Sequence, residues 1–176
     1  MNLRLKRTPG IYLVGFMGSG KTTIGRLLAQ RLGWSFADLD EEIEAAELSA
    51  ISAIFAERGE PEFRRIEAEM LRQHVHSIER GQPAVIAMGG GAFAQRENRE
   101  LALQHGIVFW LDCPFETVQR RVAPTSHRPL ARDPERFAAL YQERREIYAQ
   151  ADVRIVIDCD DPVVAVETIV NHPILQ

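Results

Sequence analysis

The sequence is poor in lysine and cysteine, and it has neither a long hydrophobic run nor a block of basic residues. Its two cysteines, Cys113 and Cys159, form no C-x-x-C pair and are too few for a disulfide framework. The longest apolar run near the start, residues 11–17, is interrupted by Gly15 and is far too short to span a membrane. The net charge of −4 makes duplex nucleic acid a poor partner. We therefore expect neither nucleic-acid nor membrane partners.

The composition is otherwise that of an ordinary soluble domain. Of 176 residues, 45% are hydrophobic and 26% are charged. A chain of this length buries about 70% of the surface that it exposes when unfolded. The basic residues Arg4, Lys6 and Arg7 are not followed by the apolar segment of a secretion signal. We expect a single domain over residues 1–176 that is cytoplasmic and monomeric.

Only two of the 21 basic residues are lysines, and the other 19 are arginines. A genome that favours arginine codons explains this ratio without a functional reason. Lys6 lies near the start of the chain, but Lys21 lies inside the most distinctive motif of the sequence. The place of Lys21 therefore needs a separate explanation.

Short apolar segments alternate with long amphipathic ones along the chain. The predicted strands are Gly10–Val14, Ser35–Leu39, Ala84–Ala87, Ile107–Leu111 and Val153–Ile157. The predicted helices are Lys21–Leu32, Glu41–Arg58, Pro61–Arg80, Gln95–His105, Pro114–Val122, Pro134–Gln150 and Pro162–Asn171. The strands are continuous hydrophobic runs, which is typical of a parallel sheet covered on both faces. The alternation predicts a three-layer α/β fold with right-handed crossovers.

The strongest motif, Gly15-Phe16-Met17-Gly18-Ser19-Gly20-Lys21-Thr22, fits G-x-x-x-x-G-K-[ST]. It directly follows a predicted strand and opens a predicted helix, as a phosphate-binding loop requires. Its glycines allow backbone N–H groups to surround phosphate oxygens, and the helix adds its positive dipole end. Lys21 supplies a charge for the β- and γ-phosphates, and the Thr22 hydroxyl can ligate Mg²⁺. The motif predicts a nucleoside triphosphate site.

Acidic residues at the ends of two predicted strands allow several interpretations. Strand alternation places Asp38 and Asp40 on one face. There they can hold Mg²⁺, orient a hydroxyl, or start the next helix with Asp40 as its cap. Asp112 ends an apolar strand as a Walker B aspartate does, but the nearby helix-opening Pro114 favours a capping role.

Glycines and arginines supply the remaining candidates. Gly89–Gly91 is either a flexible turn or a place where a substrate approaches the backbone. Arg144 falls on the apolar stripe of its predicted helix, so it needs a partner, either an anionic ligand or an internal ion pair. Of Arg64 and Arg65, one can face a pocket beside Phe63 while the other faces water.

Residues 123–133 lack periodicity and contain two prolines, which predicts a mobile loop. Arg121, Arg128 and Arg132 flank or lie within it. A lid that carries arginines can close over phosphates, exclude water and neutralise developing charge.

The sequence resembles the shikimate kinase family over nearly its whole length, in the family's order. The resemblance rests on the loop GFMGSGKTT, Asp38-x-Asp40, Phe63-Arg64 with Glu67, Gly89–Gly91, Arg128-Pro129-Leu130 and Arg144 with Tyr148. It implies the nucleoside-monophosphate-kinase-like P-loop fold, with a five-stranded parallel sheet in the order 2-3-1-4-5. It also implies transfer of the ATP γ-phosphoryl group to the 3-hydroxyl of shikimate in aromatic amino-acid biosynthesis.

The resemblance implies roles for the matching residues, with ATP and shikimate as substrates and Mg²⁺ as the cofactor. The catalytic residues would be Lys21, Asp40 as the base, and Arg128. ATP would be bound by Gly18, Ser19, Gly20, Lys21, Thr22, Thr23, Arg121 and Arg128. Shikimate would be bound by Asp40, Phe55, Phe63, Arg64, Glu67, Gly89, Gly90, Gly91 and Arg144. Mg²⁺ would be bound by Thr22 and, through water, by Asp38.

Within that set, Arg64 and Arg144 would clamp the shikimate carboxylate, and Glu67 would position Arg64. Arg121 would lie over adenine. The substrate-binding helical region would span about residues 41–80, and the lid about residues 121–133.

Two other functions fit part of the pattern. Another small-molecule P-loop kinase, such as a gluconate kinase, would share the phosphate loop and lid but would not need Arg64, Arg144 and the three glycines together. A kinase-like sensor would bind a ligand to regulate transcription without turning it over. The sequence contains no DNA-binding helix pair, which favours the enzyme.

Overall fold

The structure is a computed structural model, which describes residues 10–122 and 133–176. In these residues, strands alternate with helices in a regular order. The elements are β1 (Gly10–Val14), α1 (Lys21–Leu32), β2 (Ser35–Asp38), α2 (Leu39–Glu47), α3 (Ile51–Arg58), α4 (Glu60–Glu79), β3 (Ala84–Ala87), α5 (Arg96–His105), β4 (Ile107–Asp112), α6 (Phe115–Val122), α7 (Pro134–Tyr148), β5 (Val153–Val156), α8 (Pro162–Val170) and the 3₁₀ turn η2 (Pro173–Leu175).

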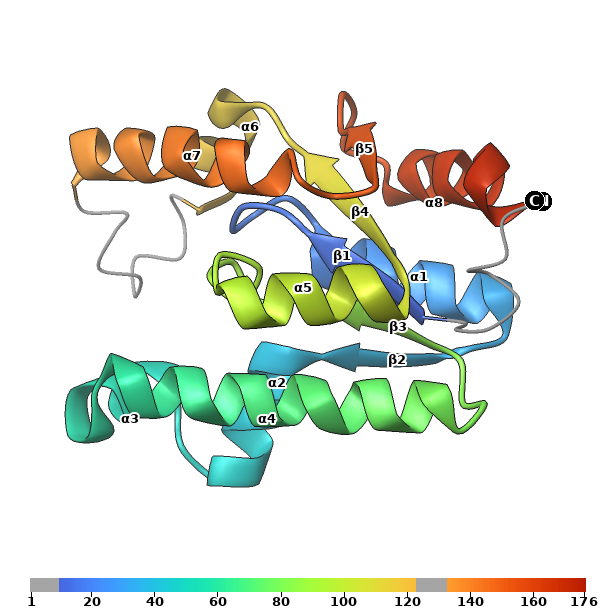
Figure 1. The fold of residues 1–176 in the computed structure, drawn as a ribbon. Helices are drawn as coiled ribbons and strands as arrows, with labels where there is room; N and C mark the ends of the chain where they lie inside the picture. Colours follow the sequence, from blue (N-terminus) through green and yellow to red (C-terminus); the bar gives the residue numbers. More distant parts are fainter. Residues whose placement is uncertain (1–9, 123–132) are drawn as a thin grey trace.

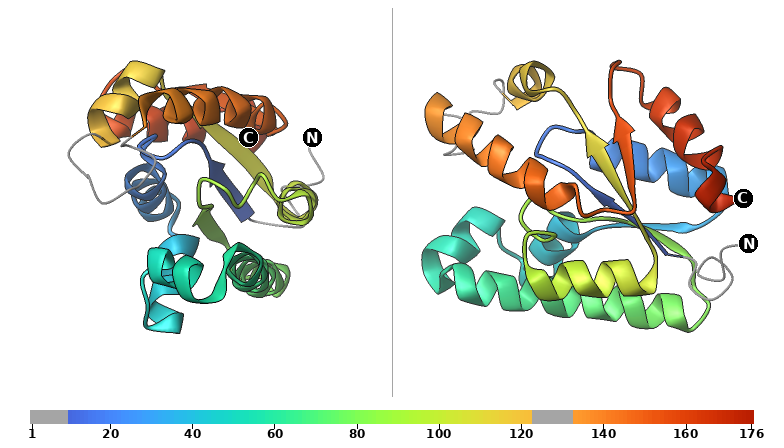
Figure 2. Two further views of the ribbon diagram at one scale, coloured as in Figure 1. Left: turned by 90° about the vertical axis from the view of Figure 1, so that its left-hand side faces the viewer. Right: turned by 45° about the horizontal axis from the view of Figure 1, so that its top comes forward.

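The strands form one parallel sheet in the order β2-β3-β1-β4-β5. This order confirms the predicted topology. Helices α1 and α8 pack together on one face of the sheet, and α4 and α5 pack together on the other, so the molecule has three layers (Figures 1 and 2). Since all strands are parallel, their carboxyl ends lie at one edge, where α/β proteins bind ligands.

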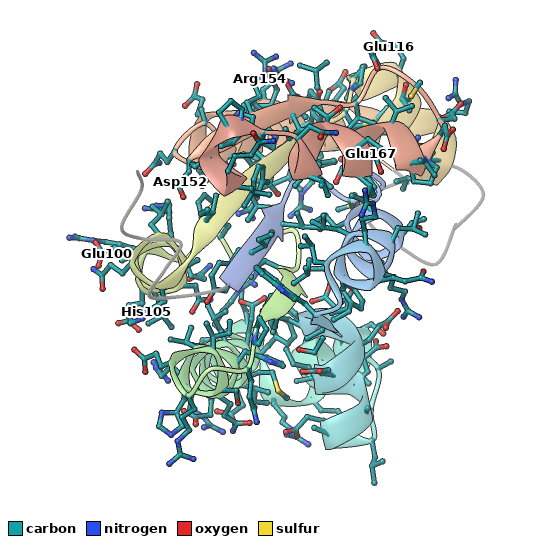
Figure 3. The ribbon with its side chains drawn as sticks, turned by 90° about the vertical axis from the view of Figure 1, so that its right-hand side faces the viewer. Glu100, His105, Glu116, Asp152, Arg154 and Glu167 are labelled. Atoms are coloured by element: carbon teal, nitrogen blue, oxygen red, sulfur yellow. The ribbon has the colours of Figure 1, made fainter. Side chains whose placement is uncertain are left out.

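The central strands account for the continuous hydrophobic runs of the sequence. Every residue of β1, β3 and β4 is buried, because helices cover both faces of the sheet at these strands. The edge strand β5 alternates between buried and exposed residues. Asp152 lies just before β5 and accepts a hydrogen bond from the Val108 amide of β4 at 2.9 Å (Figure 3).

The structure corrects two predictions about the segment after β2. Residues 41–58 do not form one helix, because the helix is interrupted at Leu48. The segment forms the two helices α2 and α3 instead. Leu48 has a left-handed backbone (φ 48°), and its amide closes the end of α2 on the Glu44 carbonyl. β2 also ends at Asp38, one residue earlier than predicted, and Leu39 already belongs to α2.

Helices α2, α3 and α4 form a subregion beside the edge strand β2 (Figure 1). It has a small hydrophobic core of its own, made of Ile43, Ile54, Phe63 and Ile66. The subregion spans Leu39–Glu79, which is close to the expected helical region at 41–80. Its helices carry candidate acceptor-binding residues to the carboxyl end of β3.

Candidate functional site

The loop between β1 and α1 has the backbone that the phosphate motif requires. Gly15, Gly18 and Gly20 have φ angles of 154°, 79° and 96°, which side chains disfavour. A Cβ on Gly15 would also lie 2.7 Å from the Leu111 carbonyl oxygen and 2.8 Å from Ser19 Oγ. The loop therefore has no room for side chains at its tightest point.

Lys21 opens α1 and folds back over the loop. Its Nζ donates hydrogen bonds to the carbonyl oxygens of Gly15 at 2.8 Å and Phe16 at 3.1 Å. Ser19 is fully buried, and its Oγ has no hydrogen-bond partner within residues 10–122 and 133–176. The positive end of the α1 dipole and the Lys21 ammonium group thus meet where an anion would bind.

Thr22 and Asp38 bring two oxygen atoms together beside the loop. The Thr22 hydroxyl donates to Asp38 Oδ2 at 2.5 Å. Hard oxygen ligands fit Mg²⁺, which binds one or two protein oxygens and takes its other ligands from phosphates and water. Among the described residues, no three His, Cys, Asp or Glu side chains come together as a metal cluster.

Asp38 also fixes the start of α2. Its Oδ1 accepts from the amides of Asp40 at 3.0 Å and Glu41 at 3.3 Å, so Asp38 is the helix cap. The alternative that placed Asp40 at the cap is wrong. The placement of both carboxylates on one strand face is also wrong, because Asp40 lies in the first helical turn and is directed by the helix.

Asp40 points at the glycine turn that follows β3. A Cβ added to Gly89 would collide with Asp40 Oδ1, so the carboxylate can approach only because residue 89 is glycine. Gly90 lies next to the phosphate loop, since a Cβ added to it would be 4.0 Å from the Met17 amide nitrogen. The loops after β1 and β3 are thus neighbours (Figure 1).

Arg64 reaches the same turn from α4. A Cβ on Gly91 would lie 2.5 Å from Arg64 Nη2, so the guanidinium can occupy this place only while residue 91 has no side chain. Arg64 Nη1 donates to both Glu67 oxygens at 3.1 and 2.9 Å. The Arg64 side chain is 19% exposed and that of its neighbour Arg65 is 65% exposed, which confirms that only one of the pair faces inward.

An aromatic pair stands beside the Arg64 guanidinium. The rings of Phe55 and Phe63 are 4.6 Å apart between centroids. The Arg64 guanidinium lies 5.2 Å from the Phe63 ring centroid and 6.0 Å from that of Phe55. The pair supplies an apolar wall and limits the orientations available to Arg64.

Glu67 is 1% exposed. Burial raises the pKa of its carboxyl group to about 7, although Arg64 and Arg144 act to lower it; the Asp40 carboxylate adds to the rise. The same interactions show that Asp40, Arg64 and Arg144 lie around one buried carboxyl group, although they come from α2, α4 and α7. The structure therefore brings together the residues that the sequence assigned to the acceptor.

Arg121 lies on the other side of the phosphate loop. Its Nη1 donates to the Gly18 carbonyl at 3.0 Å, and its Nη2 pairs with Asp160 Oδ1 at 2.8 Å. Arg121 lines a cavity of about 740 Å³ between the loop Gly18–Gly20 and the segment 158–162, which connects β5 to α8. Such a cavity is large enough for a nucleoside.

Sequence reasoning missed the β5–α8 side of this cavity. The segment 158–162 follows a strand of the parallel sheet at its carboxyl end, and that position was the available signal. Arg128 and Arg132, the other arginines assigned to the lid, lie outside the described residues.

Asp112 has a different role from either sequence interpretation. It is 4% exposed and lies in β4, and its carboxylate accepts hydrogen bonds from Arg145 of α7 and Arg154 of β5. Asp112 therefore does not cap a helix, as the sequence had favoured, but forms ion pairs with these two arginines. Arg154 lies on the edge strand β5 (Figure 3).

Comparison with known proteins decides the family. The family model described as shikimate kinase matches residues 17–172. This chain belongs to the shikimate kinase family. The shikimate kinase of Persephonella marina is 43% identical to it over 163 residues, which cover 92% of this chain and 97% of the relative. The chain is therefore a kinase.

Solved structures of shikimate kinases have the same fold. The enzyme of Acinetobacter baumannii, solved in complex with shikimate, is 35% identical with a TM-score of 0.85 and covers 94% of this chain and 93% of its own. That of Aquifex aeolicus is 34% identical with a TM-score of 0.79, over 92% and 93% of the two chains. The coverage shows that the shikimate kinase likeness extends over both halves of the site.

Proposed function

We propose that the chain transfers the γ-phosphoryl group of ATP to the 3-hydroxyl of shikimate, giving shikimate 3-phosphate and ADP. This reaction belongs to the route to chorismate and the aromatic amino acids. The observation that carries the proposal is the meeting of Asp40, Arg64 and Arg144 around Glu67, beside a glycine turn that adjoins the phosphate loop. Membership of the family, and the relative solved with shikimate, support the same acceptor.

The nucleotide side of the site can bind ATP through the phosphate loop. The backbone amides of Gly18, Ser19 and Gly20 and the start of α1 with Thr23 would surround the phosphates. Lys21 would exchange its bonds with the loop carbonyls for bonds with the β- and γ-phosphates. Arg121 would flank the adenine in the cavity beside Asp160.

The acceptor side suits a small polyol with one carboxylate. Two guanidinium groups, those of Arg64 and Arg144, would bind the carboxylate in a fixed fork geometry that lysine cannot offer. Asp40 and the backbone of Gly89, Gly90 and Gly91 would bind ring hydroxyls. Phe55 and Phe63 would contact the apolar face of the ring.

Catalysis would consist mainly of positioning and charge neutralisation, as in other phosphoryl transfers. Asp40 would accept the proton of the attacking hydroxyl as that oxygen bonds to phosphorus. Lys21 would stabilise the negative charge on the phosphates. Thr22 and Asp38 would hold Mg²⁺, which neutralises phosphate charge when bound, with Asp38 acting through water.

The remaining expectations are part of the same proposal. We propose one kinase domain that works as a monomer in the cytoplasm, with Arg128 on a lid over the phosphates. Within residues 10–122 and 133–176, no helix is long and apolar enough to cross a membrane.

A coupled assay of ADP release with several acceptors tests the proposal. We expect turnover with shikimate and none with gluconate, and we expect Lys21→Ala to abolish turnover while its circular dichroism spectrum stays unchanged. Turnover with gluconate instead would contradict the assigned substrate. Shikimate binding without turnover at saturating Mg-ATP would favour a sensor.

A further inference from the structure

One face of α7 is tied to the sheet by three polar side chains. Tyr141, Arg145 and Tyr148 are spaced four and three residues apart, so they lie on the same face of the helix. Each one makes a hydrogen bond to a segment at the carboxyl end of β3 or β4. Arg144, which the proposed function assigns to the acceptor, is carried by the same helical turns.

Tyr148 makes the contact nearest to the acceptor site. Its hydroxyl donates to the Gly90 carbonyl oxygen at 2.6 Å. The side chain is 1% exposed, and burial raises the pKa of the phenol above its ordinary value, so the hydroxyl stays a donor at any working pH. Gly90 is the central residue of the turn against which Asp40 and Arg64 pack.

Peptide geometry makes this bond a constraint on the turn. In a planar trans peptide, the C=O and the following N–H point in opposite directions. Since the Gly90 carbonyl points to Tyr148, the Gly91 N–H must point away from α7. The bond therefore holds the orientation of the central peptide of this turn, whose ends are already joined by the hydrogen bond from the Ala92 amide to the Gly89 carbonyl at 3.0 Å.

The other two contacts fix the helix itself. The Tyr141 hydroxyl donates to the Cys113 carbonyl at 2.7 Å, and Arg145 Nη1 donates to the Tyr141 oxygen at 3.0 Å. Arg145 also pairs with the buried carboxylate of Asp112. These bonds hold α7 against β4, so that Tyr148 can set the distance between α7 and the glycine turn.

We propose that Tyr148 is a positioning residue for the acceptor site, because its bond to Gly90 locks the glycine turn to the helix that carries Arg144. It does not touch the substrate. It holds two substrate-binding parts, the backbone of residues 89–91 and the Arg144 guanidinium, in one fixed arrangement. This role rests on the proposed function, since it assumes that shikimate binds between these parts.

The test is Tyr148→Phe, which keeps the ring and its packing and removes only the hydroxyl. We expect the KM for shikimate, and its Kd measured by calorimetry without nucleotide, to rise about fivefold to tenfold, which is the scale of one lost hydrogen bond. The KM for ATP should change less than twofold. The matched control is Tyr12→Phe, because Tyr12 is fully buried in β1 and its hydroxyl has no hydrogen-bond partner in the described part of the chain. This control should leave both KM values unchanged.

The outcomes distinguish a positioning role of Tyr148 from a purely structural role and from a failure of the proposed function. A purely structural tyrosine would lower the melting temperature in Tyr148→Phe and leave the shikimate Kd unchanged, which would overturn the inference. An equal rise of both KM values would overturn it as well. If the unsubstituted protein does not phosphorylate shikimate, the proposed function fails first, and the inference fails with it. Normal turnover with an unchanged shikimate KM in Tyr148→Phe contradicts the inference alone.

Discussion

Arg144 and Arg145 are adjacent on α7 but have different surroundings. Neighbouring residues of a helix point about 100° apart, so the two side chains diverge. Arg145 pairs with Asp112 and stacks on the Trp110 ring, with its guanidinium 5.1 Å from the ring centroid. Arg144 lies close enough to Glu67 and Tyr148 for its charge to oppose the rise that burial causes in the pKa of each. Arg145 therefore fixes the helix, and Arg144 is directed at the proposed acceptor site.

We expect Arg144→Ala to raise the KM for shikimate by roughly 30-fold to 150-fold, the equivalent of about 2–3 kcal/mol for a lost charged hydrogen-bond pair. The KM for ATP should change little. Steady-state kinetics with each substrate varied in turn measures both constants. Arg96→Ala, at an exposed arginine of α5, is the matched control and should change neither. Equal losses for both substrates would mean that Arg144 serves only the fold.

Glu67 gives a prediction about pH. Because burial raises its pKa from 4.5 to about 7, the folded protein binds this proton more tightly than the unfolded chain does. Its contribution to stability is complete below about pH 4.5 and is lost as the pH rises through about 7. In Glu67→Gln this dependence is absent. From pH 5 to pH 8, the parent should therefore lose up to roughly 3 kcal/mol relative to the variant.

Urea unfolding at a series of pH values measures this difference. Glu116→Gln, at an exposed glutamate of α6 (Figure 3), is the control and should run parallel to the parent. Parallel curves for Glu67→Gln and the parent would show that the Glu67 carboxyl group does not titrate in this range.

The α2–α3 connection shows what local patterns miss at the scale of elements. Residues 41–58 contain no proline or glycine, and so the periodicity predicted one helix. The chain instead turns at Leu48, and the Glu44 carboxylate accepts the Ile51 amide at 2.9 Å to start α3. The turn allows α3 to pack on α4, which is a tertiary gain that no local signal encodes.

Leu48 is the only non-glycine residue with a positive φ among the residues that the structure describes, and it is 92% exposed. A left-handed backbone costs a residue with a Cβ about 1–2 kcal/mol. Glycine avoids this cost but loses more conformational entropy on folding, which offsets part of the gain. We expect Leu48→Gly to stabilise the protein by about 0.5–1 kcal/mol in chemical denaturation. Leu48→Ala keeps the Cβ and should give no comparable gain; a similar gain would assign the effect to the exposed leucyl group instead.

The strands and the phosphate loop could be predicted because each has a strong local signature. Fully buried strands are continuous apolar runs, and the loop combines three glycines with Lys21 between a strand and a helix. The partners of Asp112 could not be predicted, since Arg145 and Arg154 lie 33 and 42 residues away. The cavity wall after β5 did have a signal in its place at the carboxyl end of a strand, but its contact with the phosphate loop depends on the assembled sheet.

At the scale of the whole molecule, the net charge is −4, although the candidate site is rich in positively charged groups. Lys21 lies at the phosphate loop, Arg121 lines the cavity beside that loop, and Arg64 and Arg144 lie near Glu67. Most of the 19 arginines have no place in the candidate site, and some form ion pairs at the surface, such as those with Glu62 and Glu100. Arg64 of α4, Arg121 of α6 and Arg144 of α7 are the exceptions, because the fold brings these three helices to one edge of the sheet.

The central claim is that this edge transfers phosphate from ATP to one hydroxyl of shikimate. The most direct measurement is the proton–phosphorus correlation NMR spectrum of the product formed from shikimate and Mg-ATP. The proposal predicts a correlation between the phosphorus and the proton on carbon 3, with one ADP released per product molecule. A phosphate on another hydroxyl, or ADP accompanied only by inorganic phosphate, would contradict it.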